Sequence, residues 1–105
     1  MTQKDIRKIV SDYLTDIKKS GIKISEAYLF GSRVKGTEHA GSDIDLCIIS
    51  EEFGKDRQKE RVNLMNLQKS DNYIIEPHPF SPADFYRGVD LLAKEIQRTG
   101  IRLQM

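Results

Sequence analysis

Residues 30–46 read FGSRVKGTEHAGSDIDL, and this stretch decides the fold of the chain. The apolar run that leads into it, residues 26–30, ends in Gly31 and Ser32. Because glycine tolerates backbone conformations that other residues avoid, the run predicts a short strand that ends in a sharp turn. The segment 42–50 begins with acidic and apolar side chains in alternation, which predicts a second strand.

Asp43 and Asp45 share one face of this second strand, with Cα atoms about 6.6 Å apart. Two carboxylates on one face project into one site, where like charges raise each other's pKa unless a cation neutralises them. Mg²⁺ suits such a site because it accepts a few carboxylate oxygens and fills its other positions with water and phosphate. A bare Asp-x-Asp pattern by itself favours a simpler interpretation, in which one aspartate caps a turn and the other is solvated.

Gly31 and Ser32 have two interpretations as well. The glycine lets the backbone approach a phosphate closely, the N–H groups of a following helix start can cradle it, and the serine hydroxyl adds a donor. Arg33 is adjacent to the turn and can contact phosphate oxygens. The simpler alternative is an ordinary strand-to-helix turn with a serine cap and a solvated arginine.

The rest of the chain predicts one α/β domain over residues 1–105, with no repeat and no linker. The segment 33–41 is expected to form a helical turn and a loop. Pro77 and Pro79 indicate that they lie at the end of the third strand, or that this strand lies at an edge of the sheet. The predicted helices are residues 2–20, 56–69 and 81–100, and the predicted strands are residues 26–30, 42–50, 73–80 and 101–103.

Apolar spacing predicts which helix faces are buried. The run 56–61 is expected to be a solvated helix face, and Cys47 a small buried residue. His78 shares strand parity with residue 76 and can face the same site, but a histidine between two prolines is more often structural. The expected buried residues are Val62, Leu64, Met65 and Leu67 in the middle helix and Phe85, Val89, Leu92 and Ile96 in the last helix.

Composition limits the function classes. With 17 basic and 16 acidic residues the net charge is +1, which disfavours direct binding to nucleic acid or to an anionic membrane. The single cysteine cannot form an internal disulfide, which is typical of the reducing cytoplasm. The first 20 residues carry charges throughout, so neither a signal peptide nor a membrane span is expected there.

The Gly-Ser pair and the Asp-x-Asp pair of the central stretch form a far more specific motif together than either does alone. Gly31-Ser32, ten residues and then Asp43-Ile44-Asp45 resemble the signature of the polymerase-beta-type nucleotidyltransferase superfamily. Residues 30–36 and 42–46 resemble its minimal nucleotidyltransferase branch: a basic residue follows Gly-Ser, a glycine lies four residues after the serine, and a serine precedes Asp-x-Asp. The resemblance covers about the first three quarters of the chain. It implies the α+β fold of that superfamily, a small mixed sheet flanked by helices.

The resemblance also implies a site and a mechanism. Gly31, Ser32 and Arg33 would hold the triphosphate of a nucleotide, while Asp43 and Asp45 would hold two Mg²⁺ ions about 3.5–4 Å apart. One ion would activate an acceptor hydroxyl and the other would stabilise the leaving pyrophosphate. The family's third carboxylate corresponds to Glu76, where many members have aspartate; the longer side chain could still ligate metal or accept a proton. Alternatively, this glutamate is an exposed edge-strand residue.

Members of the minimal branch are commonly encoded beside a helical HEPN-type toxin. The resemblance therefore implies a cytoplasmic antitoxin that transfers AMP from ATP to a tyrosine hydroxyl of that partner. Two alternatives stay open: a non-catalytic or weakly catalytic antitoxin that neutralises its partner by binding, and a small-molecule nucleotidyltransferase whose pocket is completed by a separate helical subunit. The nucleotide preference and the choice between Mg²⁺ and Mn²⁺ stay open too.

Overall fold

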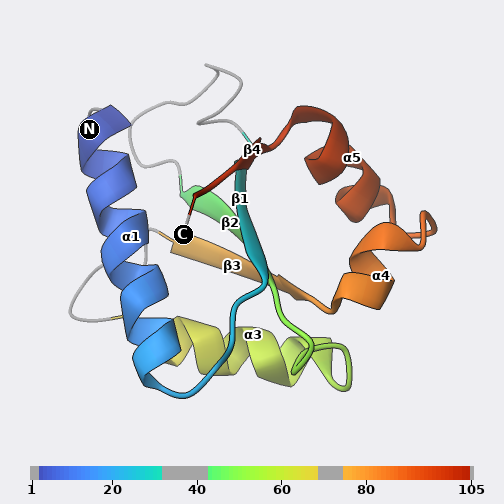
Figure 1. Ribbon diagram of the computed structural model, residues 1–105, viewed down its shortest axis with the longest axis horizontal. Helices are drawn as coiled ribbons and strands as arrows, with labels where there is room; N and C mark the ends of the chain where they lie inside the picture. Colours follow the sequence, from blue (N-terminus) through green and yellow to red (C-terminus); the bar gives the residue numbers. More distant parts are fainter. Residues whose placement is uncertain (1–2, 32–42, 69–74, 105) are drawn as a thin grey trace.

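A four-stranded sheet forms the centre of the computed structural model, which describes residues 3–31, 43–68 and 75–104. The elements in chain order are α1 (Gln3–Lys19), β1 (Glu26–Phe30), β2 (Ile44–Ile49), α3 (Arg57–Asn66), β3 (Ile75–Phe80), α4 (Pro82–Tyr86), α5 (Leu91–Thr99) and β4 (Ile101–Arg102). α1 covers one face of the sheet, and α4 and α5 cover part of the other (Figure 1). A sheet flanked by helices is the architecture that the sequence predicted.

The strand order β3-β2-β1-β4 makes the sheet mixed. β2 runs antiparallel to β1 and parallel to β3, and β4 pairs antiparallel with β1. The end of β1 therefore meets the beginnings of β2 and β3 at one end of the sheet. Phe30 is the partner of Asp45, and Asp45 is the partner of Glu76. Three residues far apart in the sequence thus form one row across the sheet.

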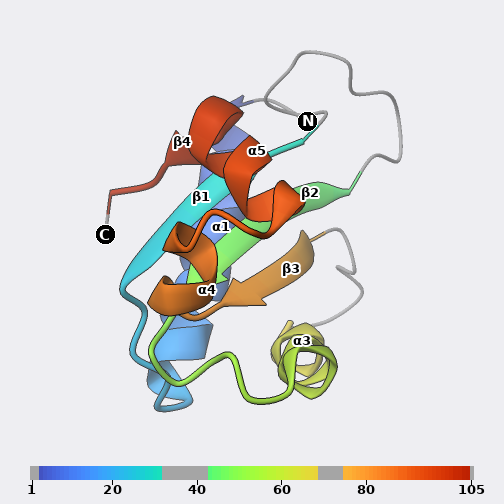
Figure 2. The same ribbon diagram turned by 90° about the vertical axis from the view of Figure 1, so that its right-hand side faces the viewer.

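Alternation along the strands divides the core into two layers. Leu46 and Ile48 pack in the layer beneath α1, whereas Cys47 and Ile49 pack in the layer beneath α4 and α5, which Figure 2 shows in front of the sheet. Cys47 is fully buried, as predicted. Asp45 has the parity of Cys47, so it lies on the α4–α5 face of the sheet. The α1 residues buried against the sheet are Ile6, Val10, Tyr13, Leu14 and Ile17.

The prolines of β3 lie at a sheet edge, as predicted, because β3 is the first strand in the order. Pro77 and Pro79 have the parity of Ile75, whose carbonyl points away from β2 and accepts a hydrogen bond from Gln68 Nε2 at 2.7 Å. The Pro79 carbonyl likewise accepts one from Arg57 Nε at 3.1 Å. The N–H groups that proline lacks are therefore on the outer side, and no bond to β2 is lost.

The last helical segment forms two helices, where the sequence predicted one. α4 begins at Pro82 as predicted, but Gly88 adopts φ +81°, a conformation that ends a helix. Asp90 then caps a new helix, α5. The prediction that Val89 is buried is wrong: it lies between the two helices and is 78% exposed.

α3 buries a narrower face than predicted. Leu64 is fully buried, but Val62 is 49% exposed, so its predicted burial is wrong. The reason is that α3 runs along the edge strand β3, and its Leu64 carbonyl accepts a hydrogen bond from Tyr13 of α1. Only the side of α3 that faces β3 and α1 is covered.

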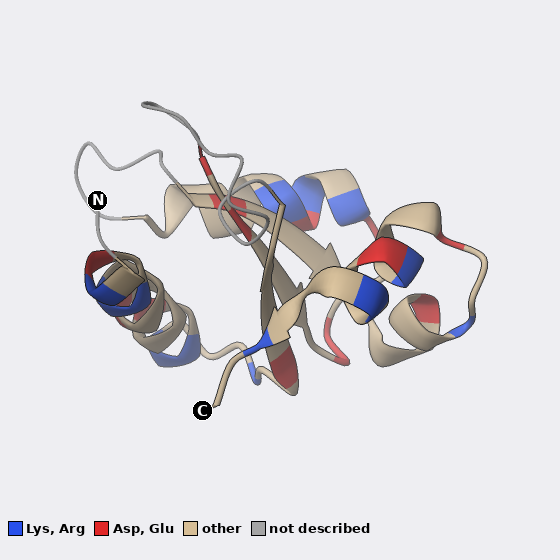
Figure 3. Ribbon diagram, turned by 90° about the horizontal axis from the view of Figure 1, so that it is seen from above, with Lys and Arg blue, Asp and Glu red and all other residues tan. Residues whose placement is uncertain are grey.

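Charge is spread over the surface. Lys and Arg residues occur on α1, α3 and α5, with no single helix carrying them all (Figure 3). This distribution fits the net charge of +1 and offers no basic stripe along the described elements. Among the described helices, none combines the length and the apolar character that crossing a lipid bilayer requires.

Asp90 connects three parts of the fold, which makes it a test of the packing. Its side chain accepts a hydrogen bond from Ala93 N–H and pairs with Arg57, whose guanidinium stacks 3.9 Å from the Phe80 ring centroid. Asp90→Ala is expected to lower the free energy of unfolding by about 1–2 kcal/mol, because losing an N-cap costs about 0.5–2 kcal/mol. Asp90→Asn keeps the cap and should cost less; urea unfolding measures both.

The charged part of this interaction is expected to depend on pH. Burial would raise the pKa of Asp90, but hydrogen bonds from Ala93 N–H and Arg57 outweigh it, so the pKa is lowered. A lowered pKa stabilises the fold above the unfolded value of about 3.9, and this contribution is lost as pH falls through the folded value. The wild type should therefore exceed Asp90→Asn in stability at pH 7, and the gap should shrink below about pH 4. If the difference in unfolding free energy between the two proteins stayed constant down to pH 2, the stabilising role of the Asp90 charge would be contradicted.

Candidate active site

Asp45 and Glu76 lie side by side where β2 and β3 begin. The parallel register pairs them directly, and both side chains point to the face that carries α4 and α5. They lie beyond the part of this face that the helices cover. The Asp45 side chain is therefore 24% exposed and the Glu76 side chain 39% exposed. Two of the three predicted carboxylates therefore share a half-open site.

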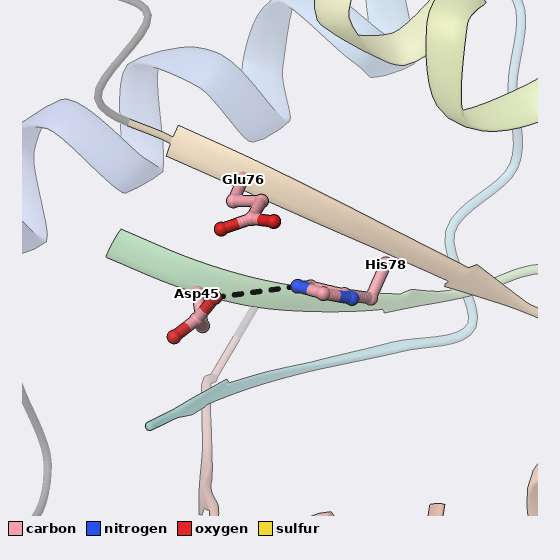
Figure 4. A group of neighbouring side chains, drawn as sticks. All are labelled: Asp45, Glu76 and His78. Carbon is pink, nitrogen blue, oxygen red and sulfur yellow. Dashed lines mark hydrogen bonds and ion pairs between the residues drawn. The ribbon is translucent and has the colours of Figure 1, made fainter. Parts of the chain in front are cut away.

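His78 joins these two carboxylates. It follows Glu76 by two residues on β3, and its Nε2 lies 3.3 Å from Asp45 Oδ1 (Figure 4). One ligand atom from each of the three residues lies within 4.8 Å of the other two. The sequence already indicated that His78 lies on the same face of its strand as Glu76, but the flanking prolines favoured a structural role. The geometry brings it into the site.

Gly31 leaves the space that the Asp45 carboxylate occupies. A Cβ atom at this position would lie 2.2 Å from Asp45 Oδ2 and 3.1 Å from its Cγ. The backbone of Gly31 also has φ +86°, a left-handed conformation that side chains disfavour. Glycine at the end of β1 is thus required twice, by the turn and by the neighbouring carboxylate.

Arg61 supplies a positive charge that the sequence did not predict for the site. Its Nη2 lies 2.5 Å from Glu76 Oε1, and its Nε is buried without a hydrogen-bond partner among the described residues. The prediction that the run 56–61 is simply a solvated face is wrong at this position. The helix α3 runs beside β3, which brings Arg61 over the strand edge; only the tertiary fold could reveal this contact.

The remaining predicted site residues are Ser32, Arg33 and Asp43. Asp43 lies one residue before β2 and is exposed, and the group formed by Asp45, Glu76 and His78 does not include it. Ser32 and Arg33 lie outside the described residues, as does the predicted helical turn at 33–41. Their proposed contacts with a nucleotide stay predictions.

The donor set of this site fits a divalent cation. Two carboxylate oxygens and one imidazole nitrogen converge within 4.8 Å; the oxygens are ligands that Mg²⁺ uses in proteins, and transition ions such as Zn²⁺ accept the nitrogen as well. The site does not fit thiol chemistry. Burial raises the pKa of the Cys47 thiol, and this residue lies beneath the helices rather than in the open part of the face.

Gly31→Ala tests whether the glycine makes room for Asp45. A left-handed backbone costs a non-glycine residue about 1–2 kcal/mol. Gly21→Ala is the matched control, because Gly21 has φ +103° but a Cβ there meets nothing within 4 Å. Displacing the carboxylate should make Gly31→Ala less stable than the control by about 1–3 kcal/mol in urea unfolding. Equal losses in the two variants would contradict the steric argument.

Comparisons with known proteins relate this fold to others. The family model of the nucleotidyltransferase domain matches residues 4–98. A crystal structure from Sulfolobus solfataricus at 1.40 Å resolution, which carries a nucleotidyltransferase assignment, is similar with a TM-score of 0.59 and 17% sequence identity over 91% of this chain and 75% of that chain. At this identity the likeness concerns the fold, and it confirms the predicted fold class. No curated protein sequence matches the chain. The match over residues 4–98 shows that the chain belongs to the nucleotidyltransferase domain family.

Proposed function

We propose that this chain, as one domain over residues 1–105, is a metal-dependent nucleotidyltransferase that transfers AMP from ATP to a tyrosine hydroxyl of a HEPN-type helical toxin and so acts as its antitoxin. The observation that carries the proposal is that the Asp45 carboxylate lies against Gly31 on one side and is paired with Glu76 on the other, at one end of the sheet. Asp45 thus joins the turn expected to hold phosphate to the carboxylates expected to hold metal.

At the α-phosphorus the reaction forms one bond and breaks one, and the acceptor hydroxyl loses its proton. The acceptor oxygen attacks the α-phosphorus of ATP, the bond from that phosphorus to the oxygen bridging to the β-phosphate breaks, and pyrophosphate leaves with the electron pair. The hydroxyl proton passes to Glu76 and from there to solvent. Gly31, Ser32 and Arg33 would bind the triphosphate through backbone N–H groups, a hydroxyl and a guanidinium.

The carboxylates of Asp43, Asp45 and Glu76 would hold the divalent ions. Bound there, such ions supply Lewis-acid stabilisation of phosphate charge and lower the pKa of the attacking hydroxyl. The chain itself holds the metal-binding carboxylates in position. Gly31 and His78 limit where the Asp45 carboxylate can lie, and Arg61 does the same for Glu76. A site held in place before substrate binds loses less free energy to reorganisation.

An exposed apolar segment supports a protein partner. Tyr86, Val89 and Leu91 lie within six residues at the junction of α4 and α5, and their exposed fractions are 51%, 78% and 80%. Clustered apolar side chains on a surface are typical of protein interfaces. The half-open site supports the same idea, because an acceptor on a second protein could reach it.

Labelling with radioactive ATP tests the proposal. The purified chain is incubated with the helical product of its neighbouring gene, with Mg²⁺ and Mn²⁺ in parallel reactions, and each protein is examined for label and added mass. We expect AMP on a tyrosine of the neighbour. Asp45→Asn should lower the rate by about 100-fold or more, because it removes a charge that acts at the reacting phosphate. Asp12→Asn is the control, since Asp12 is exposed on α1 and pairs only with Lys8 among the described residues.

The other outcomes separate the alternatives. Absence of label, together with tight binding of the neighbour that survives Asp45→Asn, would overturn catalysis and favour neutralisation by binding. Absence of both label and binding would favour a small-molecule acceptor. Label that persists at the wild-type rate in Asp45→Asn would contradict the proposed site.

A further inference from the structure

We propose that His78 is a metal ligand beside Asp45 and Glu76, and that its nitrogen makes the site prefer a first-row transition ion such as Mn²⁺ to Mg²⁺. The inference rests on the proposed function only in that it concerns the same site. It goes further because it adds a ligand that the nucleotidyltransferase signature did not supply and decides between ions that the carboxylates alone leave open.

Asp45 and His78 form a direct hydrogen bond, and the distance between their two atoms is also one that two ligands of a single ion can have. An ion with bonds of about 2.1 Å holds adjacent ligand atoms about 3.0 Å apart at a right angle and about 3.4 Å apart at the tetrahedral angle. His78 Nε2 and Asp45 Oδ1 lie 3.3 Å apart, between these values. Glu76 offers an oxygen within 4.8 Å of both atoms, and rotation about its side-chain bonds can bring it closer.

The imidazole is fixed in this orientation by its surroundings. Its ring packs edge-on against Phe30 with centroids 5.0 Å apart, and its side chain is only 16% exposed. Pro77 and Pro79 restrict the backbone on either side, since proline fixes φ. Arg57 secures the strand through the Pro79 carbonyl. Figure 4 shows a ring nitrogen of His78 facing Asp45. These contacts hold it there, and a fixed ligand needs little rearrangement to bind.

Ligand chemistry gives the ion preference. Mg²⁺ is a hard cation that takes oxygen ligands and keeps several waters, so an imidazole nitrogen adds little to its affinity. First-row transition ions accept nitrogen and oxygen ligands together. A site of two carboxylates and one imidazole should therefore discriminate against Mg²⁺, whereas a site of three carboxylates should not.

The test uses the full chain with metal alone, without ATP or partner. Binding of Mn²⁺ is followed by the loss of the free-ion electron paramagnetic resonance signal, and competition with Mg²⁺ gives the selectivity. His78→Gln is expected to lower the preference for Mn²⁺ over Mg²⁺ by about tenfold or more. His78→Asp should restore affinity through an oxygen and shift the preference toward Mg²⁺. Asp12→Asn, on the exposed face of α1 away from the site, is the control and should leave the affinity for both ions and their ratio unchanged.

Electron spin-echo modulation of the Mn²⁺-loaded wild type supplies a measurement that needs no variant. Coupling to an imidazole ¹⁴N nucleus is expected, and its disappearance in His78→Gln would assign the nucleus. Absence of nitrogen coupling in the wild type, or equal weakening of Mn²⁺ and Mg²⁺ in both His78 variants, would overturn the proposal and leave His78 as a structural residue. Nitrogen coupling without AMP transfer would sink the proposed function but not this inference; AMP transfer without coupling would do the reverse.

Discussion

The register of β2 is the constraint on which the rest of this structure depends. β2 pairs antiparallel with β1 and parallel with β3, so three strand ends meet and Phe30, Asp45 and Glu76 form one row. A shift of either pairing by one residue would turn the partner side chain to the other face of the sheet. Glu76 would then point toward the α1 layer, where a carboxylate without a partner is costly. The hydrophobic pattern of the two layers therefore also fixes the polar site.

The sequence was sufficient where the signal is local. Apolar spacing predicted α1, the caps predicted the start of α4, and two prolines predicted an edge strand. The central motif singled out Gly31 and Asp45, and the resemblance to a family singled out Glu76; their roles in catalysis stay predictions. The division of the last helix was missed because Gly88 and Asp90 each fit within a helix on their own; only together do they end one helix and cap the next.

The rest of the site could not be predicted because it depends on packing between distant segments. Parity placed His78 on the correct face, but only the parallel pairing brings its nitrogen within 3.3 Å of Asp45. Arg61 contacts Glu76 because α3 runs along β3, which no pattern in either segment predicts. For Ser32, Arg33 and Asp43 the family signature remains the basis of their proposed roles.

The prolines of β3 have a consequence for assembly. The outer edge of this strand could offer N–H groups only at Ile75, because Pro77 and Pro79 have none, and the carbonyls of Ile75 and Pro79 are already bonded to side chains. Such an edge cannot serve as a template for another strand, so it resists edge-to-edge aggregation. The candidate site can therefore stay half open beside an edge strand without inviting the sheet to grow there, and any strand added by another chain would have to join at β4.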